Sequence, residues 1–180
     1  MHNLPDLILP DIMTHSFKVP KMLVPQDIYL VLGDPVLGGM RSPNTMHTNW
    51  KSLAAMGFKW VVNLESSKPT YNCTPLFLLA CVELENLPLP TSVPSDPKNE
   101  FRKICEIVDY AEDKILDGEG VLIHCTGGRG RSGVVIGGIL KKLGYDFFTI
   151  INYLDLLHKR RGKAGFPESK WQSQLVENFC

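Results

Sequence analysis

The sequence predicts an α/β fold with a central, mostly parallel sheet of four to five strands that is flanked by helices. Short apolar segments bounded by Gly, Pro or polar residues alternate with helical patterns, and the last third of the chain is helical throughout. This order of elements is typical of a parallel sheet covered on both faces. A length of 180 residues is sufficient for one domain with a substantial core.

The expected strands are apolar runs of strand length, and we expect them to be buried. They are Ile28–Leu32, Trp60–Leu64, Leu79–Leu84 and Val121–His124.

The expected helices show the spacing of an amphipathic or buried helix. In the longest of them, Phe101, Ile104 and Val108 fall on one apolar stripe, and Gly118 follows as a stop signal. The predicted ranges are Asn49–Met56, Pro97 to about Leu116, Gly133–Leu143, Phe147–Arg161 and Glu168–Phe179.

The N-terminal segment 1–26 contains four of the thirteen prolines and no regular period. We expect it to be an extended arm that packs on the domain formed by residues 27–180. Its first residues contain no basic region, and Pro5 and Pro10 interrupt them, so we expect no signal peptide.

Composition excludes several function classes. Nineteen basic and nineteen acidic residues cancel, so general nucleic-acid binding is not expected, and no apolar run reaches membrane-spanning length. The five cysteines are odd in number and lack metal-ligand spacing, which favours a reducing compartment. We expect a cytoplasmic monomer, with access to the nucleus, that needs no metal or organic cofactor.

The segment from Val121 to Gly133 carries the strongest functional pattern: a buried strand, a glycine-rich turn and an apolar helix. Gly127, Gly128 and Gly130 let the backbone curl so that consecutive N–H groups point at one centre and form an anion nest. The helix adds its positive N-terminal end. Arg131 supplies a planar fork that can bind two phosphate oxygens. We therefore expect phosphate binding by residues Thr126, Gly127, Gly128, Arg129, Gly130 and Arg131.

The same positive field favours the thiolate form of Cys125, which is the reactive nucleophile. Transfer of a phosphoryl group to sulfur needs charge neutralisation on the phosphate oxygens, which the turn and Arg131 would supply. Ser132 could hydrogen-bond the sulfur and ease its departure. The preceding His124 could tune Cys125 or be a hydrogen-bonded core histidine, with its side chain on the opposite side of the strand.

These residues form the pattern His-Cys-x5-Arg-Ser, which resembles the protein tyrosine and dual-specificity phosphatase superfamily. Within that superfamily the chain is most similar to the atypical cyclin-dependent-kinase-associated phosphatase group. The supporting residues are Gly127-Gly128 inside the turn and Gln172, seven residues before Phe179. The resemblance implies the corresponding α/β fold and a phosphomonoester hydrolase that acts through a phosphocysteine. The implied substrate is a phosphorylated protein or a small phosphomonoester.

The resemblance also implies a mobile loop whose aspartate protonates the leaving oxygen. The corresponding segment is 87–96, and its alignment places Thr91, or alternatively Leu89, at the acid position; neither side chain can donate that proton. The nearby Asp96 precedes Pro97, so it is either the N-cap of the long helix or a displaced acid. Without an acid we expect slow turnover that favours aryl phosphates, because phenolates are weakly basic leaving groups.

Two alternatives stay open. A module that binds phosphate and turns over little is consistent with Thr91, and a phosphoinositide or inositol-phosphate phosphatase is consistent with Arg129, which could seat a second phosphate. Arg129 could equally be a charge that faces solvent. The basic run 158–163 is interpreted as a helix C-terminus, where cations offset the negative dipole end.

Overall fold

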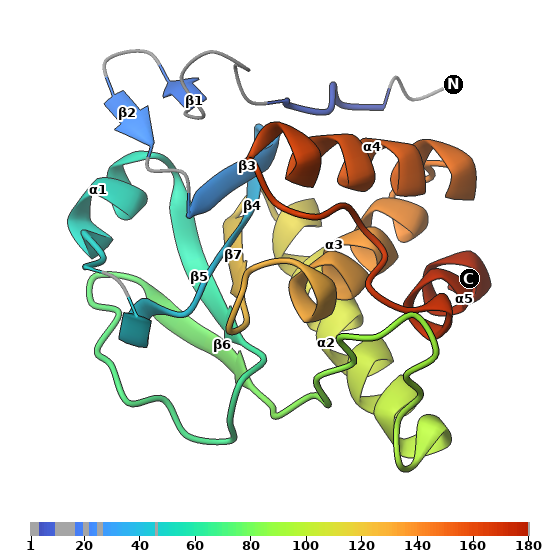
Figure 1. The fold of residues 1–180 in the computed structure, drawn as a ribbon. Helices are drawn as coiled ribbons and strands as arrows, with labels where there is room; N and C mark the ends of the chain where they lie inside the picture. Colours follow the sequence, from blue (N-terminus) through green and yellow to red (C-terminus); the bar gives the residue numbers. More distant parts are fainter. Residues whose placement is uncertain (1–3, 10–16, 20–21, 25–26, 46, 180) are drawn as a thin grey trace.

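The computed structural model describes residues 4–9, 17–19, 22–24, 27–45 and 47–179 (Figure 1). Its centre is a five-stranded sheet in the order β3-β4-β7-β5-β6, in which β3 is antiparallel to β4 and the other neighbours are parallel. The strands are β3 (Ile28–Gly33), β4 (Val36–Met40), β5 (Phe58–Asn63), β6 (Phe77–Cys81) and β7 (Gly120–His124). This arrangement confirms the predicted fold class.

Helices cover both faces of the sheet, as predicted (Figure 1). One helix, α1, packs against β5, while α2 and α3 pack against the sheet on the other side and α4 and α5 pack on α3. Their bounds are α1 (Trp50–Ala55), α2 (Pro97–Leu116), α3 (Gly130–Lys142), α4 (Phe147–Arg160) and α5 (Lys170–Asn178); a 3-10 turn, η1, spans Pro43–Thr45. The middle strand β7 is fully buried and ends at the glycine-rich turn.

Strand β4 was not predicted, because its sequence contains the pair Gly38-Gly39, which usually interrupts a strand. The structure shows why glycine is needed there. A Cβ on Gly38 would lie 2.6 Å from the carbonyl oxygen of Tyr29, and one on Gly39 would lie 2.3 Å from the Tyr29 ring. The predicted strand Leu79–Leu84 is instead β6, which begins at Phe77 and ends at Cys81.

The structure describes three short segments of the N-terminal region. Strands β1 (Phe17–Val19) and β2 (Met22–Val24) pair in antiparallel orientation. Residues 4–9 are extended along β3, where the Ile8 amide donates to the carbonyl of Val31 at 3.0 Å and the Tyr153 hydroxyl donates to the carbonyl of Ile8 at 2.7 Å. The rest of the predicted arm, residues 1–3, 10–16, 20–21 and 25–26, lies outside the described residues.

Neither a membrane-spanning helix nor a cluster of metal-ligating side chains is present in the described part of the chain. No helix there combines the length and the apolar composition that a membrane crossing requires. The same residues contain no cluster of His, Cys, Asp and Glu side chains suited to a metal ion.

Candidate active site

Cys125 lies directly after β7 and is buried, with 3% of its surface exposed. The turn that follows reaches α3 within five residues, and α3 begins at Gly130, three residues earlier than predicted. At Gly128 the backbone φ is +63°, and an added Cβ would meet the backbone of Met40 at 2.5 Å. Only glycine fits there, because the turn presses against the end of β4.

The outer side of this turn is held by neighbouring elements. The Ser42 amide donates to the carbonyl of Thr126 at 3.2 Å, and the Arg161 guanidinium donates to the carbonyl of Gly128 at 3.3 Å. Arg161 is buried over the Tyr29 ring, 4.0 Å from its centroid, and bonds His158 Nδ1 at 2.8 Å. Burial lowers the pKa of Arg161. The basic run 158–163 is therefore more than a solvated helix end, since Arg161 braces the turn.

Arg131 occupies the first turn of α3 and points across to the ends of two strands. Its Nη1 donates to the carbonyl oxygens of Leu64 and Leu84, both at 3.2 Å, and its Nη2 donates to the Thr126 hydroxyl at 2.6 Å. These contacts fix the guanidinium beside the turn. They also leave donors of the planar fork available to an anion.

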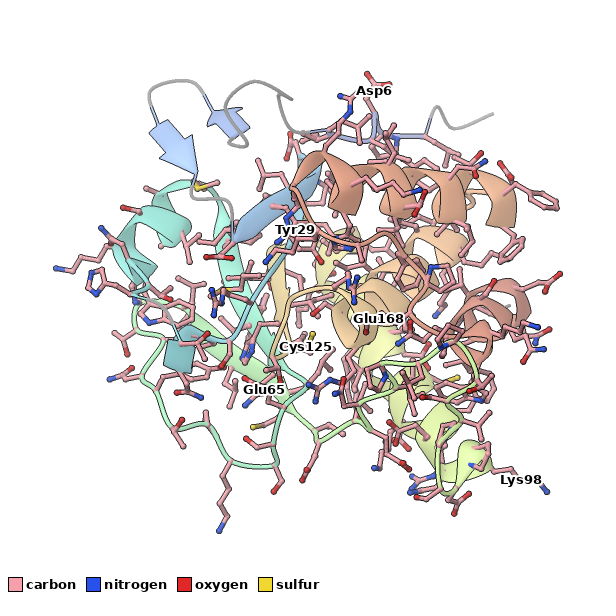
Figure 2. All side chains as sticks on the ribbon, viewed as in Figure 1. Asp6, Tyr29, Glu65, Lys98, Cys125 and Glu168 are labelled. Carbon is pink, nitrogen blue, oxygen red and sulfur yellow. The ribbon has the colours of Figure 1, made fainter. Side chains whose placement is uncertain are left out.

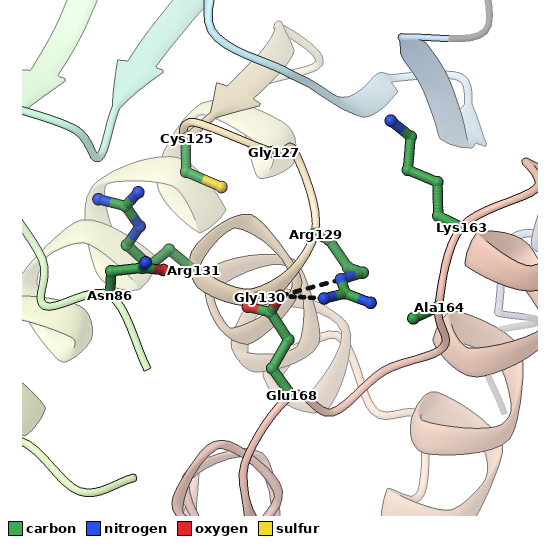
Figure 3. A pocket seen from close by; sticks show the side chains of 9 residues that line it. All are labelled: Asn86, Cys125, Gly127, Arg129, Gly130, Arg131, Lys163, Ala164 and Glu168. Carbon is green, nitrogen blue, oxygen red and sulfur yellow. Dashed lines mark hydrogen bonds and ion pairs between the residues drawn. The ribbon is translucent and has the colours of Figure 1, made fainter. Parts of the chain in front are cut away.

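A cavity of about 360 Å³ opens in front of the turn (Figure 3). It brings together Cys125 and four other residues of the predicted site, Gly127, Arg129, Gly130 and Arg131. The remaining lining residues are Asn86, Lys163, Ala164 and Glu168. Three cations and one carboxylate line it, so its charge favours an anion.

Arg129, predicted either to face solvent or to seat a second phosphate, lines the cavity and forms an ion pair with Glu168. The Glu168 atom Oε1 accepts from Arg129 Nε at 2.9 Å and from Nη2 of the same side chain. Both side chains are mostly buried, with 23% and 13% exposed. Two hydrogen bonds from the planar guanidinium to one carboxylate oxygen restrain the orientation of both side chains.

Ser132 follows Arg131 in α3 and is fully buried. Its hydroxyl makes no hydrogen bond with any described residue, Cys125 included. A buried hydroxyl without a partner costs about 1–3 kcal/mol, so its retention needs a reason. The predicted contact with the departing sulfur would provide one.

The candidate acids of the loop lie elsewhere. Asp96 is the N-cap of α2, where its carboxylate accepts from the Asn99 amide at 3.1 Å. Figure 2 shows Lys98, in the first turn of α2, well away from Cys125. Thr91 and Leu89 are exposed, and in the part of the chain that the structure describes none of the three lines the cavity. The geometry supports the cap interpretation of Asp96.

Replacing Asp96 by alanine should therefore affect stability and leave the pH dependence of catalysis unchanged. Loss of the cap should lower the free energy of unfolding by about 1 kcal/mol. Asp146 is the comparison, because it caps α4 by accepting from the Thr149 amide at 3.0 Å and, in addition, from the Thr149 hydroxyl. Asp146→Ala should lose at least as much stability as Asp96→Ala, and neither variant should change the pH–rate profile. An altered profile for Asp96→Ala alone would assign that carboxylate to the reaction.

His124 points away from the cavity into a polar cluster behind the strand. Its Nε2 lies 2.5 Å from the Tyr71 hydroxyl, and its Nδ1 lies 3.6 Å from Glu65 Oε2. Burial lowers the pKa of His124 to about 4, so the ring is neutral at neutral pH despite the nearby carboxylate. Of the two interpretations, this supports the core histidine, since a neutral ring supplies no charge to the thiolate.

Four residues near the turn were missed as site residues. Asn86, Lys163 and Glu168 line the cavity, and Arg161 braces the turn from behind. All four come from segments distant in sequence from residues 121–133, so local pattern offers little signal. The sequence does show the basic run 158–163 and a glutamate, Glu168, before the last helix. It does not show where the side chains of these residues point.

Solved structures with a similar fold include tyrosine and dual-specificity phosphatases. Tk-PTP in its active form is 22% identical with a TM-score of 0.52, over 79% of this chain and 90% of the other. Kinase associated phosphatase (KAP) is 18% identical with a TM-score of 0.56, over 80% and 85%. PTPMT1 in complex with PI(5)P is 13% identical with a TM-score of 0.61, over 85% and 94%. At such low sequence identity, the likeness to these structures shows a shared fold and nothing more.

The sequence itself defines the family. Residues 38–145, more than half of the chain, match the family model described as "Tc-R-P: Polymorphic toxin system, DSP-PTPase phosphatase". The chain belongs to this family of dual-specificity-type phosphatase domains. Comparison with curated protein sequences finds no significant match. The specific resemblance to the cyclin-dependent-kinase-associated group stays a prediction.

Proposed function

We propose that this domain hydrolyses phosphomonoesters through a phosphocysteine formed on Cys125. One observation carries the proposal: a buried cysteine at the end of a central strand opens into a cavity lined by Arg129, Arg131 and Lys163. The substrate class that fits this chemistry is a phosphorylated protein or a small aryl phosphate.

The roles follow from the positions of the groups. Cys125 as thiolate attacks phosphorus, and the bond from phosphorus to the leaving oxygen breaks as the phosphocysteine forms. The amides of residues 126–130 and the N-terminus of α3 offset charge on the equatorial oxygens, and Arg131 binds two of them. Water then releases orthophosphate, and Ser132 can donate to the departing sulfur.

The substrate preference that we propose depends on whether a side chain can protonate the leaving oxygen. No aspartate of the 87–96 segment lines the cavity in the described structure. General acid catalysis is worth about 10²–10⁴ in rate, and phenolates need it least. Phosphotyrosine and aryl phosphates should therefore be better substrates than phosphoserine, phosphothreonine or phosphoinositides. The ion pair of Arg129 with Glu168 also argues against a second phosphate subsite on Arg129.

An aryl phosphate assay on the wild type and on Cys125→Ser tests the proposal. We expect turnover in the wild type and loss of at least about 10³-fold in the variant, because serine is a far weaker nucleophile at neutral pH. Binding of inorganic phosphate should persist in Cys125→Ser, since the amides and Arg131 remain. Equal rates for the two proteins, together with retained phosphate binding, would instead support a binding module without turnover.

A further inference from the structure

A second cavity, of about 340 Å³, adjoins the one in front of Cys125. Asn86 and Arg131 line both cavities, and Figure 3 shows these two residues on one side of the first cavity, with Lys163 across from them. The volume of the second cavity lies within the range of about 300–1,000 Å³ that is usual for ligand pockets. A substrate whose phosphoryl group is bound by Arg131 therefore has room for a neighbouring group on this side.

We propose that Glu83 and Glu85, which line the second cavity, bind a cationic side chain of the substrate, an arginine or lysine next to the phosphotyrosine. This inference rests on the proposed function and names its substrate class more closely. That class is a phosphotyrosine segment with a basic neighbour. The two glutamates then act as specificity-determining residues, because they touch the substrate away from the phosphorus.

The backbone between the two glutamates is bonded to the arginine that binds phosphate. Leu84 is buried, and its carbonyl accepts from Arg131 Nη1 at 3.2 Å. The Leu84 amide donates to the carbonyl of Leu64 at 3.2 Å. The Glu85 amide donates to Glu100 Oε1 at 2.6 Å. These bonds fix the segment that carries both carboxylates beside the guanidinium, so a bound cation would lie next to the bound phosphoryl group.

The two carboxylates carry charge that no ion pair with a described residue neutralises. Glu83 is exposed, and within the described residues its side chain makes neither a hydrogen bond nor an ion pair. Glu85 accepts from the Ser95 amide at 3.0 Å and from the Ser95 hydroxyl at 2.7 Å, and both donors are neutral. These hydrogen bonds lower the pKa of Glu85, so the group is ionised at neutral pH.

The cations of the second cavity are already engaged. Lys103 lines it, but its ammonium pairs at 3.2 Å with Glu100, whose side chain is almost completely buried. The same ammonium donates to the carbonyl of Glu83 at 3.2 Å. Arg131 binds the phosphoryl group in the proposed reaction. The second cavity therefore keeps an excess of negative charge, whereas the first is positive, and the two favour groups of opposite sign.

A long basic side chain suits this cavity in shape as well as in charge. Leu84 lines the cavity between the two glutamates and offers an apolar surface to the methylene stem of an arginine or lysine. The charged head would then meet the carboxylates in charge-assisted hydrogen bonds. An acidic side chain in the same place would meet two like charges and be rejected.

Turnover of phosphotyrosine peptides measures this preference. Each peptide carries one arginine at a different position next to the phosphotyrosine and is compared with a parent peptide that has glutamine at all of these positions. We expect kcat/KM to be about 10-fold higher for the best arginine peptide than for the parent, the combined effect of two partly exposed charge pairs. The advantage should shrink at high salt, because exposed ion pairs are screened.

Variants of the two glutamates assign the preference to these residues. The arginine peptide should lose its advantage over the parent in the double variant Glu83→Gln, Glu85→Gln. In Glu83→Lys the preference should turn towards a peptide with glutamate at the same position. Glu177→Gln, the same change on the exposed side of α5, should keep the wild-type ratio of the two peptides.

The inference is overturned if arginine at no position improves on the parent peptide, if the advantage survives in the double variant, or if Glu83→Lys gains nothing from glutamate. Each ratio is read beside the turnover of a small aryl phosphate by the same protein. A wild type that hydrolyses neither peptides nor the aryl phosphate would overturn the proposed function itself, which is a different result.

Discussion

Replacing Gly128 by alanine should abolish phosphate binding and reduce turnover by at least about 10³-fold, because misplacing even one stabilising donor costs about 10²–10³. The added Cβ would meet the backbone carbon of Met40 at 2.5 Å and the Arg41 nitrogen at 2.6 Å. Backbone atoms of β4 cannot move aside as a side chain would. The turn must therefore shift, and its amides would no longer converge on one point.

The measurements are steady-state rates with an aryl phosphate and competitive inhibition by inorganic phosphate. Gly118→Ala is the matched control, because Gly118 also has a positive φ, +78°, but an added Cβ there meets no atom within 4 Å. That variant should lose about 1 kcal/mol of stability from backbone strain and keep its activity. Wild-type inhibition by phosphate in Gly128→Ala would show that contact with β4 does not shape the turn.

The central part of this fold was predictable because its signals are local. Residues 121–133 contain the strand, the turn and the start of the helix in one continuous segment, so sequence order reflects spatial order. Strand β4 lacked such a signal. Its glycines are required by Tyr29, from the adjacent strand β3, and by the Phe58 ring, from β5, and no local rule contains that information.

The same distinction applies to the candidate site. Cys125, Arg131 and Ser132 were predicted, since they lie inside the motif. Glu168 lies almost forty residues further along the chain and reaches the turn only because α5 packs on α3. The sequence predicts a proton-transfer group in the 87–96 loop, whereas the carboxylate that lines the cavity in the described structure is Glu168, just before α5 (Figure 3).

The wild-type protein should lose stability as pH falls from 6.5 to 5, and His124 should account for a large part of the loss. Burial holds the pKa of His124 near 4, below its ordinary value of 6.5. Between these values the unfolded chain binds a proton that the folded protein does not, so stability rises with pH and falls on acidification. One such proton over this range amounts to about 2 kcal/mol.

Urea unfolding of the wild type and of His124→Gln at several pH values between 5 and 6.5 measures this effect. In the variant, the free energy of unfolding should depend less steeply on pH. The difference in slope should correspond to about one proton taken up on unfolding, whatever the stability of the variant at neutral pH. His158 is the comparison, because it is also fully buried and its pKa is also lowered by burial, so His158→Gln should flatten the curve similarly. The groups facing His124 are Tyr71, Glu65 and Arg131. An unchanged slope in His124→Gln would mean that the attraction of Glu65 offsets burial and holds the folded-state pKa of His124 near its ordinary value.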